Sequence, residues 1–348
     1  MSFAAQEETL FALLFDADLR ERFYANPAAA LTGRGLEDAE RDDFLGIAPA
    51  ALRLDAQLRL DMVLSQLCAG FPVAVTLVAA RAGGLDLLRD LVTAELMRSA
   101  PEDRPLRFAE QLRARLRTCA AADAAGLLAA ADAAADAAAD GAGTRPGIRS
   151  GISSDDDPHG GEGDVGADAS PALMALLEAE LGMARTGAEL RHYVLDTGFA
   201  PGEDEPVPDD WQMRPASMAA HVSAVVIPGP YSELHTQLCP VPDRALWRLL
   251  RDRAPDRGQV AEALGAARPL LHVARAELER MSSCAPEVRH RTVELGAGFA
   301  ALLPFLDGER AIATLLRELA AAGGDAAAIE RARGGFRQLL ESGMIVLC

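Results

Sequence analysis

The segment HTQLC places a histidine and a cysteine four residues apart, at His235 and Cys239. On a helix this spacing brings both side chains to one face, and imidazole and thiolate groups are zinc ligands. A zinc site needs three or four such ligands, and the spacing of His192, His221 and Cys284 does not require them to complete one. The sequence gives even less support for a thiol nucleophile, because no cysteine at the start of a helix and no asparagine that would orient the histidine is evident. We therefore expect no metal, no cofactor and no catalytic residue.

Arginines in the last predicted helix, IERARGGFRQLLESG, indicate a different chemistry, namely the binding of an acidic peptide. A groove between this helix (325–342) and the strand 291–295 could accept a guest peptide as an added strand through main-chain hydrogen bonds. The arginines would then meet acidic side chains of the guest. The alternative for Gly334 and Gly335 is a tight helix crossing with the arginines as a solvated face, since each mid-helix glycine costs about 1 kcal/mol relative to alanine. The predicted peptide-binding residues are Arg291, Thr292, Val293, Glu294, Leu295, Arg331, Arg333, Phe336 and Arg337.

Composition limits the classes of partner. The chain has 348 residues, half of them hydrophobic, a formal net charge of −18 and no lysine. Nucleic-acid binding draws most of its affinity from basic residues on phosphates, so the charge argues against a DNA regulator. Five scattered cysteines without a CxxC pair indicate a reducing cytosol. The first residues are acidic where a secretion signal would be basic, and no apolar run is long enough to span a bilayer. We expect a cytoplasmic protein that binds neither nucleic acid nor membrane.

The pattern along the chain predicts an α+β protein that is predominantly α. Residues 1–119 form an expected helical bundle, with helices over 73–81, 84–99 and 104–119 among them. Residues 120–170 are rich in Ala, Gly and Asp and have almost nothing to bury, which is typical of a disordered linker. Residues 171–348 form the second domain.

The second domain ends in an expected winged helix at about 269–348. Three strands are predicted, at 221–227, 270–275 and 291–295, with the last two pairing across CAPE. For residues 269–281 a continued helix is the alternative to the strand at 270–275. Three helices follow, at about 298–306, 309–322 and 325–342, and SGMIVL ends the chain as a wing-like strand or an extended tail.

The N-terminal segment LFDADLRERFYANPAAALTGRGLEDAERDDFLGIAPAALRLDAQLR resembles a known helical module. It carries the succession LRERF-x-x-x-P-x-x-x-L, GL-x-x-x-E and I-x-P-x-x-L. The module belongs to partner proteins of multinuclear non-haem iron oxidative enzymes in ribosomal peptide natural-product biosynthesis, such as the methanobactin and thiaglutamate pathways. LLPFLDGERAIATLLRELAAAG likewise resembles the winged-helix peptide-recognition element of such partners. The long acidic linker and a predicted helix around 171–190 depart from the family pattern.

The resemblance implies an accessory role without catalysis, because in the family the iron ligands lie on the partner enzyme. The protein would bind the leader of a precursor peptide and present it to the iron enzyme, which the N-terminal helices would dock through an apolar face. Phe23, Leu52 and Leu60 are apolar there but are more typical of a core. PEVRHRTVELGAGFAALLPFLDG also resembles the winged helix appended to some methyltransferases and JmjC-type oxygenases. Neither a nucleotide-binding glycine loop nor an HxD…H triad accompanies it.

Three alternatives stay open beside the accessory role. A DNA-binding regulator would need a basic recognition helix, whereas Glu330 and Glu341 offset the arginines here. An enzyme in its own right would retain a metal or cofactor through purification. A scaffold would link two proteins and bind no peptide.

Overall fold

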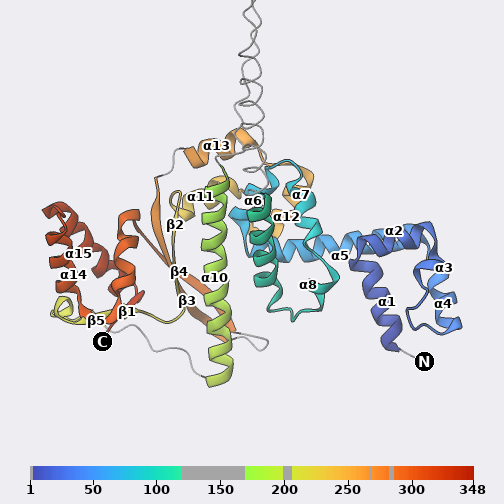
Figure 1. Ribbon diagram of the computed structural model, residues 1–348, viewed down its shortest axis with the longest axis horizontal. Coiled ribbons are helices and arrows are strands. Elements are labelled where there is room, and N and C mark those ends of the chain that lie inside the picture. The colour runs from blue at the N-terminus through green and yellow to red at the C-terminus, as the bar shows by residue number, and fades with distance from the viewer. Residues whose placement is uncertain (1–2, 120–168, 199–205, 266–267, 282–285) are drawn as a thin grey trace, which may run out of the picture.

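The structure is a computed structural model, and it describes residues 3–119, 169–198, 206–265, 268–281 and 286–348. It confirms an α+β protein that is predominantly α, with small antiparallel sheets. Figure 1 shows the N-terminal helices at one end, the C-terminal helices α14 and α15 at the other, and a sheet and the long helix α10 between them. The predicted linker lies outside the described residues, apart from its last two positions, which begin α10 (Ala169–Thr197).

Residues 3–119 are helical, as predicted. Asp16 caps the second helix by accepting the N–H of Leu19 at 2.9 Å, and Pro27 starts the third. The predicted helix 84–99 is wrong as one element, because Thr93 caps a new helix and divides it into two. The helices are α1 (Phe3–Phe15), α2 (Ala17–Ala25), α3 (Pro27–Ala30), α4 (Asp38–Leu45), α5 (Pro49–Ala69), α6 (Pro72–Ala79), α7 (Gly84–Asp90), α8 (Ala94–Arg98) and a helix over 104–119.

A single hydrophobic core joins segments from both sides of residues 120–168. It contains Leu64, Phe71 and Phe108 from the first segment, and Leu177 and Trp247 from the second. Helix α10 packs against α6, and α12 (Asp243–Asp252) packs against α5. Two further helices, α11 (Tyr231–Leu238) and α13 (Arg257–Gly265), complete this region. The segments 1–119 and 171–348 therefore pack together through this core, and the division into domains stays a prediction. Within the described ranges no helix is long and apolar enough to cross a membrane.

An antiparallel sheet of order β2-β3-β4 lies beside α10 (Figure 1). Strand β2 (Val222–Ile227) and the start of β3 (Leu270–Met281) confirm the predicted strands. β3 pairs with β4 (Pro286–Gly296), from Leu270 opposite Gly296 to Met281 opposite Pro286, which confirms the expected pairing. The sheet has an apolar face on each side. One face packs into a second hydrophobic cluster, the C-terminal core around Phe336 and Leu339, through Leu271, Val273, Val293 and Leu295. On the other face, Ala276 packs with Leu190 and Val194 of α10.

The last 50 residues differ from the prediction in two places. The first expected helix, 298–306, is a 3-10 helix, η3 (Ala297–Phe305), with Pro304 inside it. The second, 309–322, begins only at Ile312, because Asp307–Ala311 is strand β5. Gly308 has a φ of +81°, which favours glycine. β5 and the C-terminal strand β6 (Ile345–Leu347) lie on either side of β1 (Pro215–Met218) in a second sheet. Strand β1 was not predicted, and a short 3-10 helix, η2 (Trp211–Met213), precedes it. Helices α14 (Ile312–Ala321) and α15 (Ala326–Glu341) cover the core.

The glycine pair in α15 gives a matched stability prediction. A Cβ on Gly335 would lie 2.6 Å from Cε2 of Phe299, whereas a Cβ on Gly334 meets nothing within 4 Å. The close approach explains Gly335, so Gly335→Ala should destabilise the protein by about 1–3 kcal/mol through overpacking. Gly334→Ala should stabilise it by about 0.5–1 kcal/mol through helix propensity. Chemical denaturation of the two variants checks this, and equal effects would contradict the packing.

Candidate functional site

The outer edge of β4 is a free hydrogen-bonding surface in the described part of the chain. β4 pairs with β3 on one side, and no described strand pairs with its other side. Ala276 of β3 donates its N–H to the carbonyl of His221, on the β2 side, at 3.0 Å. The main-chain N–H and C=O groups of successive residues in a strand point alternately to the two neighbouring strands. Those of Arg275 and Val273 therefore point toward β4. The main-chain groups of their partners in β4, Arg291 and Val293, point back toward β3.

The intervening residues of β4 direct their N–H and C=O groups outward. By the same alternation, these residues are His290, Thr292 and Glu294. A row of outward groups on an exposed edge is a template for an added strand. α10 contacts β4 on one face of the sheet, and α15 contacts it near the other. The open edge therefore lies between two helices.

The predicted β4 residues divide between the two faces. Val293 and Leu295 are buried in the C-terminal core and cannot contact a guest through their side chains. Thr292 is exposed. Glu294 accepts the N–H of Tyr231 at 2.6 Å, and Arg291 pairs with Glu277 at 2.7 Å.

The predicted residues of α15 are not brought together into one wall. Phe336 is fully buried and packs edge-on against Phe299, with ring centroids 4.9 Å apart. Arg333 pairs with Glu330 one turn earlier, and Arg337 with Glu341 at 2.8 Å. Arg331 is exposed. The two carboxylates therefore neutralise the charge that would attract an acidic guest to Arg333 and Arg337.

Two arginines of the sheet fix the C-terminal end of α15. Arg275 donates to the carbonyl of Gly343 at 2.9 Å, and Arg291 to that of Ser342 at 3.4 Å. The last carbonyls of a helix have no partner within the helix and carry partial negative charge. These bonds hold α15 against the sheet, so Arg291 has a structural role here.

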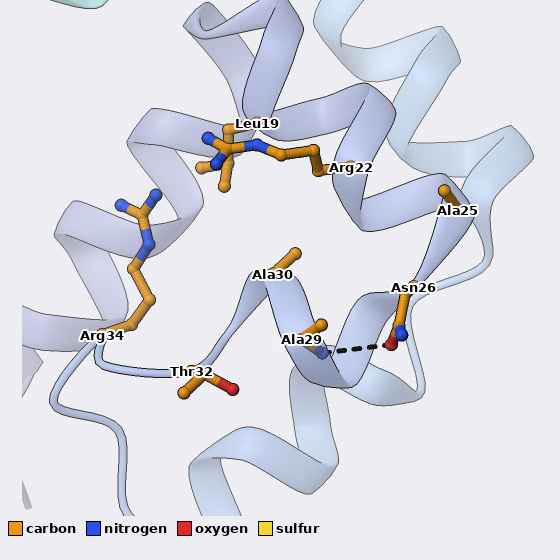
Figure 2. Close-up of a pocket in the computed structure, with 8 residues that line it drawn as sticks. All are labelled: Leu19, Arg22, Ala25, Asn26, Ala29, Ala30, Thr32 and Arg34. Carbon is orange, nitrogen blue, oxygen red and sulfur yellow. Dashed lines mark hydrogen bonds between the residues drawn. The ribbon is translucent and has the colours of Figure 1, made fainter.

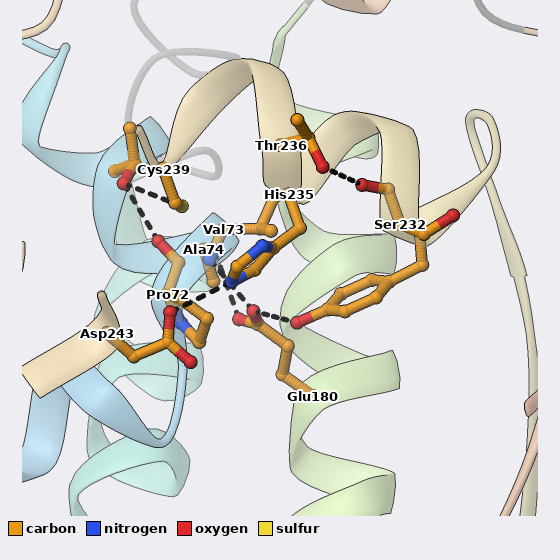
Figure 3. A network of polar contacts seen from close by, with 11 residues as sticks. Pro72, Val73, Ala74, Glu180, Ser232, His235, Thr236, Cys239 and Asp243 are labelled. Atoms are coloured by element: carbon orange, nitrogen blue, oxygen red, sulfur yellow. Dashed lines mark hydrogen bonds and ion pairs between the residues drawn. The ribbon is translucent and has the colours of Figure 1, made fainter. Parts of the chain in front are cut away.

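A buried carboxylate joins the two packed segments at the centre of the protein. Glu180 of α10 is 1% exposed. Its two oxygens accept the N–H groups of Val73 and Ala74, at 2.8 and 3.0 Å, at the start of α6 (Figure 3). The hydroxyl of Tyr231 donates to it at 2.8 Å. Burial raises the pKa of Glu180 to about 7, while these hydrogen bonds oppose the rise.

Tyr231 connects this carboxylate to β4. Its hydroxyl binds Glu180 and its main-chain N–H binds Glu294, whose backbone faces the open edge. The ring of Tyr231 lies tilted beside that of His272, with centroids 5.3 Å apart, and His272 is buried and lies 3.5 Å from Glu294. Burial lowers the pKa of His272. The open edge and the start of α6 are thus linked by direct contacts.

His235 and Cys239 do not form a site together. Nε2 of His235 bonds Asp243 at 2.9 Å, and Cys239 ends α11, where its thiol lies 3.6 Å from Thr76 (Figure 3). Burial raises the pKa of the Cys239 thiol to about 12, which disfavours a thiolate. Among the described residues, no three metal-ligating side chains gather.

A depression of about 340 Å³ lies on the N-terminal helices (Figure 2). Arg22 and Arg34 line it over an alanine floor, and its lining contains no carboxylate. Asn26 uses its side-chain oxygen to accept the N–H of Ala29 at 3.1 Å. The lining therefore offers mainly hydrogen-bond donors.

Sequence reasoning missed an exposed apolar stripe on α5. Leu54, Leu58 and Met62 recur every four residues and are 61%, 59% and 57% exposed. Phe23 and Leu52 are buried, as their apolar periodicity indicated, and Leu60 is partly buried. Counting apolar residues could not separate the two faces, because α5 is apolar almost all around. No protein-family model, curated protein or solved structure matches the chain.

Proposed function

We propose that this protein is a non-catalytic accessory protein that binds an extended peptide along the outer edge of β4. The guest is the leader of a precursor peptide, which the protein presents to an iron-dependent oxidative enzyme. The observation that carries the peptide-binding step is the row of outward main-chain groups at His290, Thr292 and Glu294, with α10 and α15 on either side. An added strand pairs with such an edge whatever its side chains.

The region around β4 is proposed to act as a winged-helix peptide-recognition element. The antiparallel strands, followed by α14, α15 and the strand β6, support this assignment. Arg275 and Arg291 hold α15 against the sheet, so the two walls of the site are fixed before a guest arrives. A preorganised site of this kind loses less free energy to ordering on binding.

The N-terminal helices are proposed to dock the oxidative enzyme. Leu54, Leu58 and Met62 supply an exposed apolar stripe for contact with the enzyme. Arg22 and Arg34 in the depression could pair with a carboxylate of the partner. The resemblance of the N-terminal segment to partner proteins of iron enzymes supports this role.

Co-purification with an iron-dependent oxidative enzyme, which we expect to be encoded beside this gene, tests the docking. The pair should elute as one complex in size-exclusion chromatography, with iron only in the enzyme. Leu58→Glu, which places a charge in the exposed stripe, should weaken the complex at least about tenfold, because a charged group is costly to desolvate. Leu45→Glu, at another exposed leucine, is the matched control. Separate elution of the two wild-type proteins would contradict the proposed complex. Metal bound to this protein alone would favour the alternative that it is itself an enzyme.

A further inference from the structure

Helix α10 covers the sheet in an order that can be followed strand by strand. On the β2 side, Gly182 packs against Ser223, and Glu189 and Tyr193 lie beside His221. Leu190 and Val194 pack on Ala276 of β3. Gly187 packs against His290 of β4, where a Cβ would lie 3.4 Å from the imidazole. The helix surface therefore turns from β2 to β4 in a single direction.

Arg191 is the next position in that direction. It lies one turn after Gly187 and is rotated by about 40° from it, away from the β2 side, since each helical residue turns about 100°. This places Arg191 beyond β4, along its open edge. Burial lowers the pKa of His290, and the nearby guanidinium of Arg191 lowers it further.

Arg191 has no hydrogen-bond or ion-pair partner among the described residues. It is only partly exposed, and burial lowers its pKa, so its charge is incompletely solvated. The nearby Nε2 of His290 is buried and also lacks a hydrogen bond within the described ranges. By contrast, Arg333 and Arg337 of α15 are paired with glutamates.

Resting on the proposed function, we propose that Arg191 selects a guest peptide that carries a carboxylate on the side chain opposite His290. A strand added to β4 places alternate side chains on the α10 face of the sheet, and the one at the level of His290 meets Arg191. A carboxylate there completes a charge-assisted hydrogen bond that the free protein lacks. Acidic recognition thus belongs to α10 rather than to α15.

Selection from a random displayed library tests this without a known ligand. Peptides of 11 residues, the length of β4, are selected against the wild-type protein and against Arg191→Met, which keeps an apolar stem and removes the charge. The control is Arg337→Met on α15. The wild type and the control should enrich peptides with Asp or Glu at one fixed position, and Arg191→Met should lose that preference.

Affinity measurements on the selected peptide complete the test. Arg191→Met should weaken the affinity for this peptide about ten- to a hundredfold. Asp→Asn or Glu→Gln in the peptide should weaken its affinity for the wild-type protein by a similar factor, but should leave its affinity for the Arg191→Met variant unchanged. Acidic enrichment that survives in Arg191→Met would overturn the role of Arg191 alone. Failure of the wild type to enrich any peptide would overturn the proposed function together with it.

Discussion

Glu180→Ala should lower the free energy of unfolding by about 3–5 kcal/mol. The substitution removes the acceptor of three hydrogen bonds and leaves the buried N–H groups of Val73 and Ala74 and the hydroxyl of Tyr231 without a partner. Each unsatisfied buried donor costs about 1–3 kcal/mol, and a small cavity adds to the loss. Chemical denaturation, followed by the fluorescence of the two buried tryptophans, Trp211 and Trp247, measures the effect.

Glu180→Gln is the matched control for this prediction. The amide keeps one oxygen that can accept from Val73 and Tyr231, but it turns an NH₂ group toward the N–H of Ala74. We expect a loss of about 1–3 kcal/mol, between wild type and alanine. A wild-type stability for Glu180→Ala would show that α10 does not hold α6 through this carboxylate.

The same carboxylate should give stability a defined dependence on pH. Its folded-state pKa of about 7 lies above its ordinary value of 4.5. The folded protein therefore holds a proton that the unfolded chain releases, so the contribution is complete below about pH 4.5 and is lost as the pH rises through about 7. The full effect is on the order of 3 kcal/mol. Relative to Glu180→Gln, the wild type should lose stability over this interval, and a constant difference would contradict the raised pKa.

Thr292→Pro should abolish most of the affinity for a guest peptide, with a loss of at least about tenfold. Thr292 directs its N–H away from β3, so proline removes an outward donor and adds bulk at the open edge while preserving the pairing of β3 with β4. The loss corresponds to at least about 1.4 kcal/mol. Fluorescence anisotropy with a peptide from the library selection measures it.

Val226→Pro is the control at the opposite edge of the same sheet. Val226 also directs its N–H outward, from β2, by the same alternation, and it is 38% exposed. It should leave peptide affinity within about twofold of wild type. A larger loss for Val226→Pro than for Thr292→Pro would move the peptide to β2.

The helices and the β3–β4 pair could be predicted because local patterns determine them. The apolar spacing of residues 11–23 and the capping by Asp16 act within a few residues, and the pairing of 270–275 with 291–295 follows from one short turn. Strand β1 and strand β5 escaped prediction, because they depend on each other across nearly 100 residues of chain. The sequence PASM has only four residues, which is too short for its alternation to indicate a strand.

The candidate site was predicted less completely than the fold. The segment 291–295 does lie at a sheet edge, yet burial of Phe336 and the pairing of Arg333 and Arg337 depend on tertiary contacts. Arg191 and Glu180 were not found because both lie on a long helix whose faces the sequence does not assign. Of the two, Glu180 could more readily have been predicted from the sequence. A charged residue among Leu176, Leu177 and Leu181 indicates a buried charge, which needs a hydrogen-bonding partner.

Amide hydrogen exchange along β4, measured residue by residue by NMR with and without a library-selected peptide, tests peptide binding at this edge most directly. In the free protein, the amides of Arg291 and Val293 should exchange slowly, because they bond β3, and those of His290, Thr292 and Glu294 should exchange fast. Bound peptide should slow these three amides strongly and change the other two little. Protection that appears elsewhere, with the three outward amides still exchanging fast, would contradict strand addition to β4.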